Sequence, residues 1–188
     1  MLVDDERKQW STPTATWPMK AVLLIAVLLL VTQVQTVAAQ GRTPEPGYLD
    51  DRSTPEAVIN SYYDAVNRRE YARAYSYWEP AAAQRELAPF DDFASGYADT
   101  TSVDATLGQG GSGVGAGQLY FTVPVTLVAS MADGSVQTYV GCYTLHLGRP
   151  QLQAVPPFHP LAIQRASIEA VDNDAATGDL IAQACPAV

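Results

Sequence analysis

The fold of this chain is decided by residues 119–147, which read LYFTVPVTLVASMADGSVQTYVGCYTLHL. Polar and apolar side chains alternate in both halves, a two-residue period that is typical of strands with one buried face. Asp133-Gly134 in the middle is a favoured turn pair. The stretch therefore predicts an antiparallel hairpin with strands over residues 119–131 and 136–147. Because Pro124 has no backbone N–H to donate, we expect an edge position or a bulge there.

The sequence before this hairpin has a helical period instead. Thr54, Pro55 and Glu56 form a helix start, with Thr as the cap, Pro at the first position and Glu beside the positive end of the helix dipole. The apolar face that follows consists of Val58, Ile59, Tyr62, Tyr63 and Val66. A second helix is predicted through Tyr71, Ala74, Tyr75 and Trp78, ended by Pro80, and a third, weaker one over residues 81–98.

Two more strands are predicted on either side of the hairpin, over residues 101–107 and 161–171. The glycine-rich residues 108–117 are interpreted as a flexible loop; the GQGGSG within them lacks the following helix that a dinucleotide site needs. Helices first and antiparallel strands later predict an α+β domain. A curved sheet wrapped around the helices would use both apolar faces and would leave a cone-shaped cavity.

The first helical stretch also carries a family resemblance. Residues 54–80, TPEAVINSYYDAVNRREYARAYSYWEP, resemble the opening of the NTF2-like (SnoaL-like) superfamily, and the resemblance extends over residues 53–172. It implies helices packed on a cone-shaped sheet. It implies no single activity, because this scaffold hosts isomerases, dehydratases, cyclases and transport factors. Asn67 and Arg68 lie where one helix turns into the next, and Asn tolerates left-handed backbone angles well.

The start of the chain is typical of a secretory signal. Lys20 precedes an unbroken apolar run over residues 21–31, and the small residues Val37 and Ala39 suit cleavage after Ala39. We expect Met19 to be the true start. The alternative is an uncleaved membrane anchor, although the run is shorter than the ~20 residues that span a bilayer. Both interpretations place the domain outside the cytoplasm, secreted or in the cell envelope.

The predicted organisation follows from these boundaries. Residues 1–39 are the signal region, 40–52 a linker, 53–172 the α+β domain and 173–188 a C-terminal tail. Cys142 lies in the second hairpin strand and Cys185 near the end of the chain. Exported chains meet oxidising conditions, so we expect a disulfide that ties the tail to the sheet; the alternative is two buried thiols.

The charge balance excludes some partners. Twenty acidic and eleven basic residues give a net charge of −9. Nucleic-acid binding needs clustered positive charge, and no basic run longer than Arg68-Arg69 follows the leader. The same balance argues against docking on an anionic membrane surface. We interpret the acidity as a solubility feature, with a basic partner as the alternative. The cysteine and histidine spacings match no zinc pattern, and we expect neither a metal nor a cofactor.

Few residues are candidates for proton transfer in the cone. Asp104, in the first predicted strand, is a candidate base if it points inward, and His146 is the other. His146 shares its strand face with Cys142, and the alternative is a satisfied strand histidine. His159 is interpreted as a loop residue, and Asp91-Asp92 as partners of a helix dipole.

Aromatic residues are the remaining candidates for a binding site. Those that could line the cone are Tyr62, Tyr63, Tyr75, Trp78, Tyr97, Tyr120, Tyr139 and Tyr143. Such a lining suits a small apolar ligand with one or two polar groups. The alternative is that the rings are simply core.

Three functions stay open at this point. The first is an exported, non-catalytic domain that binds a small ligand or a protein partner. The second is a lyase or isomerase of the SnoaL type, with Asp104 or His146 as base. The third is an interaction module that dimerises through the open face of its sheet.

Overall fold

The computed structural model describes residues 47–185, which belong to one compact unit of the chain, Pro44–Val188. The predicted signal region, the start at Met19 and most of the linker lie outside the described residues. Within the described part, no helix is both long and apolar enough to cross a membrane.

The first helix among the described residues is α2 (Pro55–Asn67), and it begins as predicted: the Thr54 hydroxyl accepts a hydrogen bond from the Ala57 N–H at 3.1 Å. Its last residue serves a different purpose from the one expected. The Asn67 amide bonds both backbone groups of Val103, donating to the carbonyl at 2.9 Å and accepting from the N–H at 2.7 Å. The left-handed residue of the turn is Arg69, with φ of 59°. Asn67 therefore fixes the end of α2 to the edge strand.

The predicted second and third helices are wrong in their bounds. They are replaced by α3 (Tyr71–Tyr75), α4 (Pro80–Glu86) and α5 (Phe90–Ser95). The interruption has a clear cause, because the chain pairs with the sheet between α3 and α4. Ile163 donates its N–H to the Tyr77 carbonyl at 2.8 Å and accepts from the Glu79 N–H at 2.9 Å. Pro80 consequently starts α4 rather than ending a longer helix.

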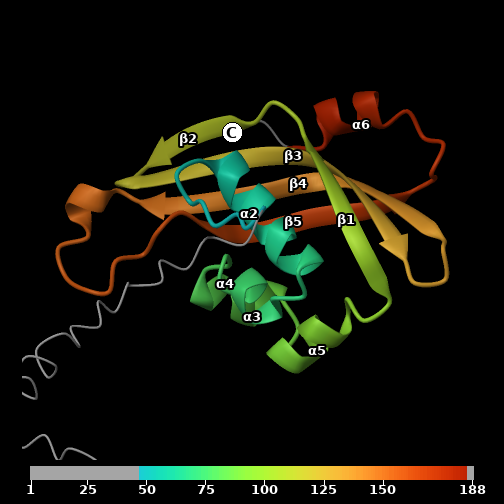
Figure 1. The fold of residues 1–188 in the computed structure, drawn as a ribbon. Coiled ribbons are helices and arrows are strands. Elements are labelled where there is room, and N and C mark those ends of the chain that lie inside the picture. Colours follow the sequence, from blue (N-terminus) through green and yellow to red (C-terminus); the bar gives the residue numbers. More distant parts are fainter. Residues whose placement is uncertain (1–46, 186–188) are drawn as a thin grey trace, which may run out of the picture. The chain divides into compact units, whose positions relative to one another are not determined.

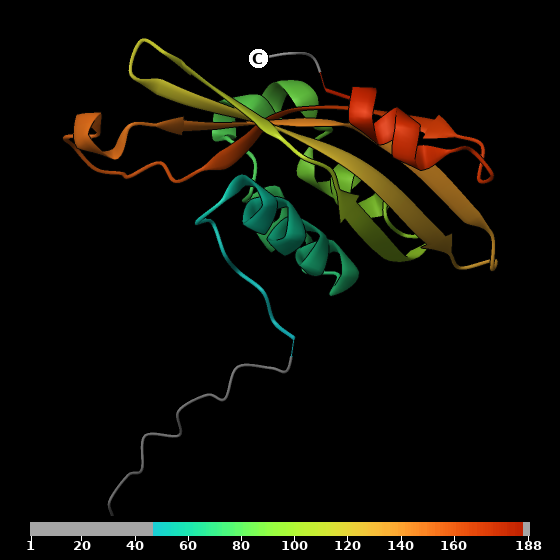
Figure 2. The same cartoon turned by 90° about the horizontal axis from the view of Figure 1, so that it is seen from above.

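The sheet is antiparallel and has five strands: β1 (Thr100–Leu107), β2 (Gly111–Gly115), β3 (Gln118–Met131), β4 (Val136–Gly148) and β5 (Ala162–Val171). The order is β1-β3-β4-β5, and β2 also pairs with β3. The predicted hairpin is confirmed, since β3 and β4 pair from Ser130↔Val136 to Gln118↔Gly148. Helices α2–α5 lie on one side of this curved sheet, here called its inner face (Figures 1 and 2).

Residues 108–117 are not the flexible loop that was predicted, because they contain β2. Ala116 and Gly117 take left-handed angles, with φ of 47° and 77°, and turn β2 into β3. The Pro124 carbonyl accepts from the Gly108 N–H at 2.8 Å, at the point where pairing passes from β1 to β2. The N–H and C=O of a strand residue point to the same side, so a donor at position 124 would point at this break between β1 and β2. Pro124 can therefore lie in a central strand without the loss of a ladder hydrogen bond.

The C-terminal tail is tied to the sheet as expected. Cys142 and Cys185 form a disulfide across 43 positions of sequence. The tail also contains a helix that the sequence did not predict, α6 (Thr177–Gln183), which contacts β3 and β4. Figure 2 shows α6 on the opposite side of the sheet from α2, here called the outer face. Ile181 lies there beside Gly108 and Pro124.

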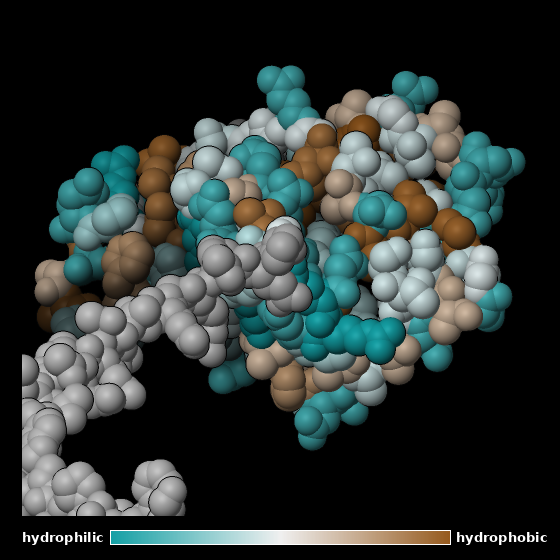
Figure 3. All heavy atoms as spheres, in the orientation of Figure 1, coloured by the Kyte–Doolittle hydropathy of each residue, from teal (hydrophilic) through white to brown (hydrophobic). Residues whose placement is uncertain are grey.

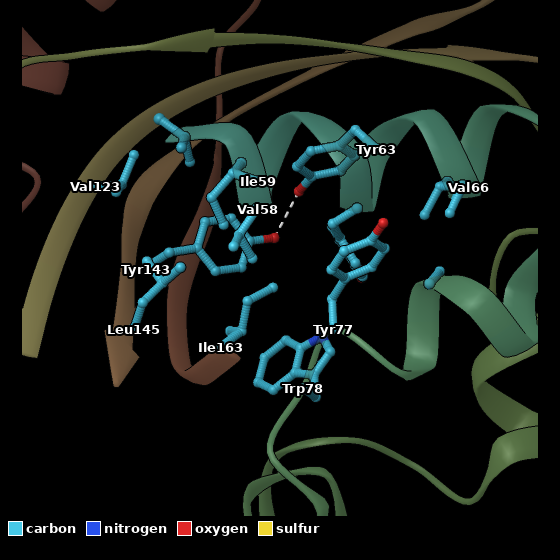
Figure 4. Packing of buried hydrophobic residues seen from close by; sticks show 14 of the residues in the cluster. Val58, Ile59, Tyr63, Val66, Tyr77, Trp78, Val123, Tyr143, Leu145 and Ile163 are labelled. Carbon is cyan, nitrogen blue, oxygen red and sulfur yellow. Dashed lines mark hydrogen bonds between the residues drawn. The ribbon is translucent and has the colours of Figure 1, made fainter. Parts of the chain in front are cut away.

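The core fills the space between α2 and the inner face (Figure 4). The two-residue alternation of β3 places Val123, Val125, Leu127 and Ala129 toward the helices, where all are buried. From α2, the matching side chains are Val58, Ile59, Tyr62, Tyr63 and Val66. The helical and strand periods read from the sequence thus meet in one core.

Removal of the disulfide should destabilise the domain. In the double variant Cys142→Ala/Cys185→Ala we expect the free energy of unfolding to fall by about 4 kcal/mol, because the unfolded chain regains the entropy of an open 43-residue loop. Denaturant unfolding of both proteins measures this. A reductant should destabilise the native protein and leave the variant unchanged, and equal stability of the two would contradict the prediction.

Candidate functional site

A hollow of about 400 Å³ opens on the inner face of the sheet, and we call it the cone. Four strands contribute its apolar wall: Val103, Leu127, Ala129, Tyr139, Ala166 and Ile168. The helical side contributes aromatic rings: Tyr62, Tyr63, Trp78, Phe93 and Tyr97, which face Tyr143 of β4. The small side chains of Ala129 and Ala166 leave the room in which this hollow lies.

Four of the five tyrosines that line the cone join their hydroxyls in two pairs. Tyr62 and Tyr97 are joined at 3.0 Å between their hydroxyl oxygens, and Tyr63 and Tyr143 at 2.6 Å. Figure 4 shows the second bond running from α2 to β4. In each pair one hydroxyl donates to the other. The second hydroxyl proton of each pair then has no acceptor among the described residues, and it remains available to a ligand.

The indole of Trp78 adds a third donor to the cone. Trp78 is 5% exposed, and its Nε1 is the one buried side-chain nitrogen or oxygen between residues 47 and 185 without a hydrogen-bond partner. Burial raises the pKa of Tyr62, and the nearby indole N–H acts weakly in the opposite direction, although the two groups do not form a hydrogen bond. A buried N–H without an acceptor is costly, so a ligand atom that accepts from it would bind favourably.

The four paired tyrosines are permanent hydrogen-bonding groups rather than acids. Burial raises the pKa of Tyr62, Tyr63, Tyr97 and Tyr143; neighbouring phenols raise the pKa of Tyr62 and Tyr63 further, whereas the hydrogen bonds from their partners act in the opposite direction at Tyr97 and Tyr143. The hydroxyls therefore keep their protons throughout the physiological range. The one carboxyl group in the lining is Glu86 at the exposed mouth, 3.9 Å from Arg165. This arrangement can orient a neutral molecule but offers no buried base.

A second hollow of about 800 Å³ lies around the chain between α3 and α4, and we call it the His146 hollow. His146 Nδ1 contacts the Glu79 carboxylate, and Nε2 lies 2.5 Å from Gln118 Oε1. The ring also stacks on Tyr120, with 5.0 Å between the ring centres. Both ring nitrogens are thus engaged by the protein. His146 thus lines this second hollow and not the cone.

The remaining predicted residues lie in several places. Asp104 is exposed and lines neither hollow; its neighbour Val103 faces the cone, so Asp104 faces the other way and the condition for a base is not met. His159 is an exposed loop residue that borders the His146 hollow. Asp91 and Asp92 are exposed in the first turn of α5.

Six of the eight aromatic candidates line the cone, and two do not. Tyr75 packs edge-on against Phe90 and Phe93 and borders the His146 hollow, while Tyr120 lies on the outer face beside His146. Sequence reasoning missed Glu79 and Gln118 as partners of His146. The sequence gives little indication of these contacts, because a polar residue before a proline and a polar residue at the start of a strand are both common.

No protein-family model matches this chain, and no curated protein matches it in sequence. Solved structures do resemble it. A SEC-C motif containing protein from Rhodopseudomonas palustris is 16% identical over 65% of this chain and 83% of that chain, with a TM-score of 0.44. An NTF2-like family protein from Streptomyces avermitilis, proposed to be a dehydratase, is 12% identical over 62% of this chain and 93% of that chain (TM-score 0.42). A proposed aromatic ring hydroxylase from Novosphingobium aromaticivorans is 13% identical over 70% and 96% (TM-score 0.48).

The likeness to NTF2-like proteins that residues 54–80 predict is therefore also present among solved structures. At these overlaps the likenesses carry no argument about function.

The buried phenols should make the domain sensitive to alkali. A raised pKa means that the folded state prefers the protonated form, so this contribution to stability is complete below the ordinary tyrosine pKa of about 10 and is lost as pH rises through the folded pKa. We expect the free energy of unfolding to fall above pH ~10. Denaturant unfolding at successive pH values measures it.

The double variant Tyr63→Phe/Tyr143→Phe is the control for this prediction. It removes two of the ionisable groups together with the hydrogen bond that joins them, so its stability should fall less steeply with pH. A decline of the same steepness in both proteins would show that other groups cause it.

Proposed function

We propose that this chain is an exported binding domain whose cone takes a small, neutral and largely apolar molecule with a hydrogen-bond acceptor, such as a carbonyl or ether oxygen. The observation that carries the proposal is the buried, unpartnered indole N–H of Trp78 in the wall of the cone. An apolar hollow with a few converging polar groups is the usual form of a ligand site, and ~400 Å³ lies within the usual range.

Neutrality follows from the lining. An anion would enter a hollow whose lining includes no cationic side chain, and it would pass Glu86 at the mouth. A buried charge without a partner is costly. A cation would meet Glu86 only at the exposed rim, where an ion pair contributes little. The tyrosine hydroxyls can both donate and accept, whereas the indole can only donate, so the ligand oxygen belongs beside Trp78.

Export is part of the proposal and is supported by the apolar run over residues 21–31 after Lys20. The disulfide between Cys142 and Cys185 agrees with it, since such bonds persist in oxidising compartments.

The two other functions have weaker support. A lyase or isomerase would need a base in the cone, but Asp104 faces away and His146 lies outside it with both ring nitrogens engaged. A module that dimerises through the outer face of the sheet would compete with α6, which contacts β3 and β4 there. Binding in the cone uses groups that are already in place.

Two naphthalenes of nearly the same shape test the proposal. 2-Acetonaphthone carries a carbonyl where 2-ethylnaphthalene carries a methylene group. We expect the full chain to bind the ketone more tightly by about three- to tenfold, the worth of one neutral hydrogen bond. In Trp78→Phe that preference should disappear. Isothermal titration with each compound measures the Kd values.

Further variants test separately where the ligand binds and whether the Trp78 indole recognises its oxygen. Ala166→Phe fills the cone from β5 and should abolish binding of both compounds, whereas Thr106→Phe, on an exposed position of β1, should leave binding unchanged. Thermal unfolding shows that each variant is folded. Binding that survives Ala166→Phe would place the ligand elsewhere, and a ketone preference that survives Trp78→Phe would remove the role of the indole.

A further inference from the structure

The connection between β4 and β5 exposes three large apolar side chains. Leu152 is 66% exposed, Val155 75% and Phe158 57%. With Val114 of β2, at 64%, they are the four most exposed large hydrophobic residues of the described chain. We call Leu152, Val155 and Phe158 the loop patch. Single exposed apolar residues are ordinary, but a group of them at one place marks an interaction surface.

The loop patch and β2 lie at the same end of the sheet. Leu152 packs directly on Gly117 in the turn between β2 and β3, where an added Cβ would come within 2.6 Å of its Cδ1. The Arg149 N–H donates to the Gly117 carbonyl at 3.1 Å. Figures 1 and 2 both show the β2–β3 turn and this connection at the left end of the sheet, and Figure 3 shows brown and tan side chains there. One projecting, apolar end results.

A small hollow extends this apolar end into the domain. It has a volume of about 250 Å³, and Phe158 borders it together with Phe121, Leu147 and Leu161. Arg52 and Thr54 lie at its edge. The exposed side of Phe158 is therefore continuous with an apolar recess and is not an isolated surface ring.

The charge around the loop patch differs from that of the whole chain. Although the net charge is −9, the sequence between Asp104 and Glu169 contains a single acidic residue, Asp133. Asp133 lies in the β3–β4 turn, at the opposite end of the hairpin. The residues that flank the loop patch are Arg149 and His159. The strands and the connection that form this end thus contribute no acidic side chain of their own, and Glu79, which reaches it from the segment between α3 and α4, contacts His146.

We infer that the loop patch inserts into the surface of a neutral lipid bilayer. Leu152 and Val155 project from a connection between strands, beside the recess that Phe158 borders, and such a tip suits the fluid boundary between headgroups and acyl chains. An uncleaved leader would supply a tether, because seven residues separate Ala39, the end of the leader, from Gly47. Fully extended, a linker of this length reaches about 25 Å, which would hold the domain close to its membrane.

The experiment labels the loop patch in the full chain. Val155→Cys carries a nitrobenzoxadiazole group, with the native disulfide kept oxidised, and Val136→Cys, next to the β3–β4 turn, carries the same group as the control. Phosphatidylcholine vesicles with nitroxide on the acyl chains are then added. We expect quenching at position 155 and none at 136, because only the first enters the bilayer. Comparing two positions of one chain separates insertion of the loop patch from any membrane binding by the leader.

Serine variants test which side chains are responsible. Leu152→Ser/Phe158→Ser should raise the lipid concentration for half-maximal quenching at position 155 by roughly tenfold or more, since two apolar side chains are lost from the bilayer. Val136→Ser/Leu180→Ser, at two exposed apolar positions elsewhere, should leave it unchanged.

Three results would overturn the inference: no quenching at position 155, equal quenching at both positions, or quenching that the patch variant does not weaken. Light scattering without lipid tests the alternative that the loop patch contacts another protein molecule. A dimer that dissociates in Leu152→Ser/Phe158→Ser, with no quenching by lipid, would assign the loop patch to a second copy of the chain.

Discussion

The hydrogen bond between the hydroxyls of Tyr63 and Tyr143 is the interaction on which the arrangement of this domain depends. It joins α2 to β4 across 80 positions of sequence, at 2.6 Å in a buried site. Buried hydroxyls must be paired, so these two long rings meet tip to tip. In this way they hold the helix at a distance from the sheet. The room that remains beside them is the cone, into which Tyr62, Tyr97 and Trp78 also project.

The short segment between α3 and α4 separates the cone from the His146 hollow. Its pairing with Ile163 gives it the alternation of a strand, so that Trp78 faces the tyrosines while Glu79 meets His146. The side chains of Trp78 and Glu79 thus point to opposite sides of the sheet at this edge. Trp78 lines both hollows, but its polar atom is left without a partner, whereas both ring nitrogens of His146 contact side-chain oxygens of the protein. This difference is the reason for proposing that a ligand binds in the cone.

Charge is distributed along this chain in a way that net values conceal. A total of −9 argues against an anionic surface for the molecule as a whole. Folding, however, brings together the acid-poor parts of β2, β3 and β4 and the β4–β5 connection at one end of the sheet. The surface that results is apolar and flanked by Arg149 and His159. The local composition of this end determines what it can contact, and the net charge of the whole chain does not show that composition.

Local sequence patterns alone determined β1, the β3–β4 hairpin, β5, the start of α2 and the α+β class. The strands follow from a two-residue period that one buried face imposes, and the start of α2 follows from the cap formed by residues 54–56. The partners Cys142 and Cys185 were also predictable, as two cysteines allow one pairing. Tertiary structure decided the rest. Pairing of the chain with Ile163 interrupts the second predicted helix. The glycine-rich residues form β2 because they pair with free backbone groups of β3. The Asn67 side chain bonds the backbone of Val103 instead of supplying the left-handed turn. Which aromatic rings enclose a cavity, and that Trp78 lacks an acceptor there, depends on contacts between residues far apart in sequence, and no local pattern records these.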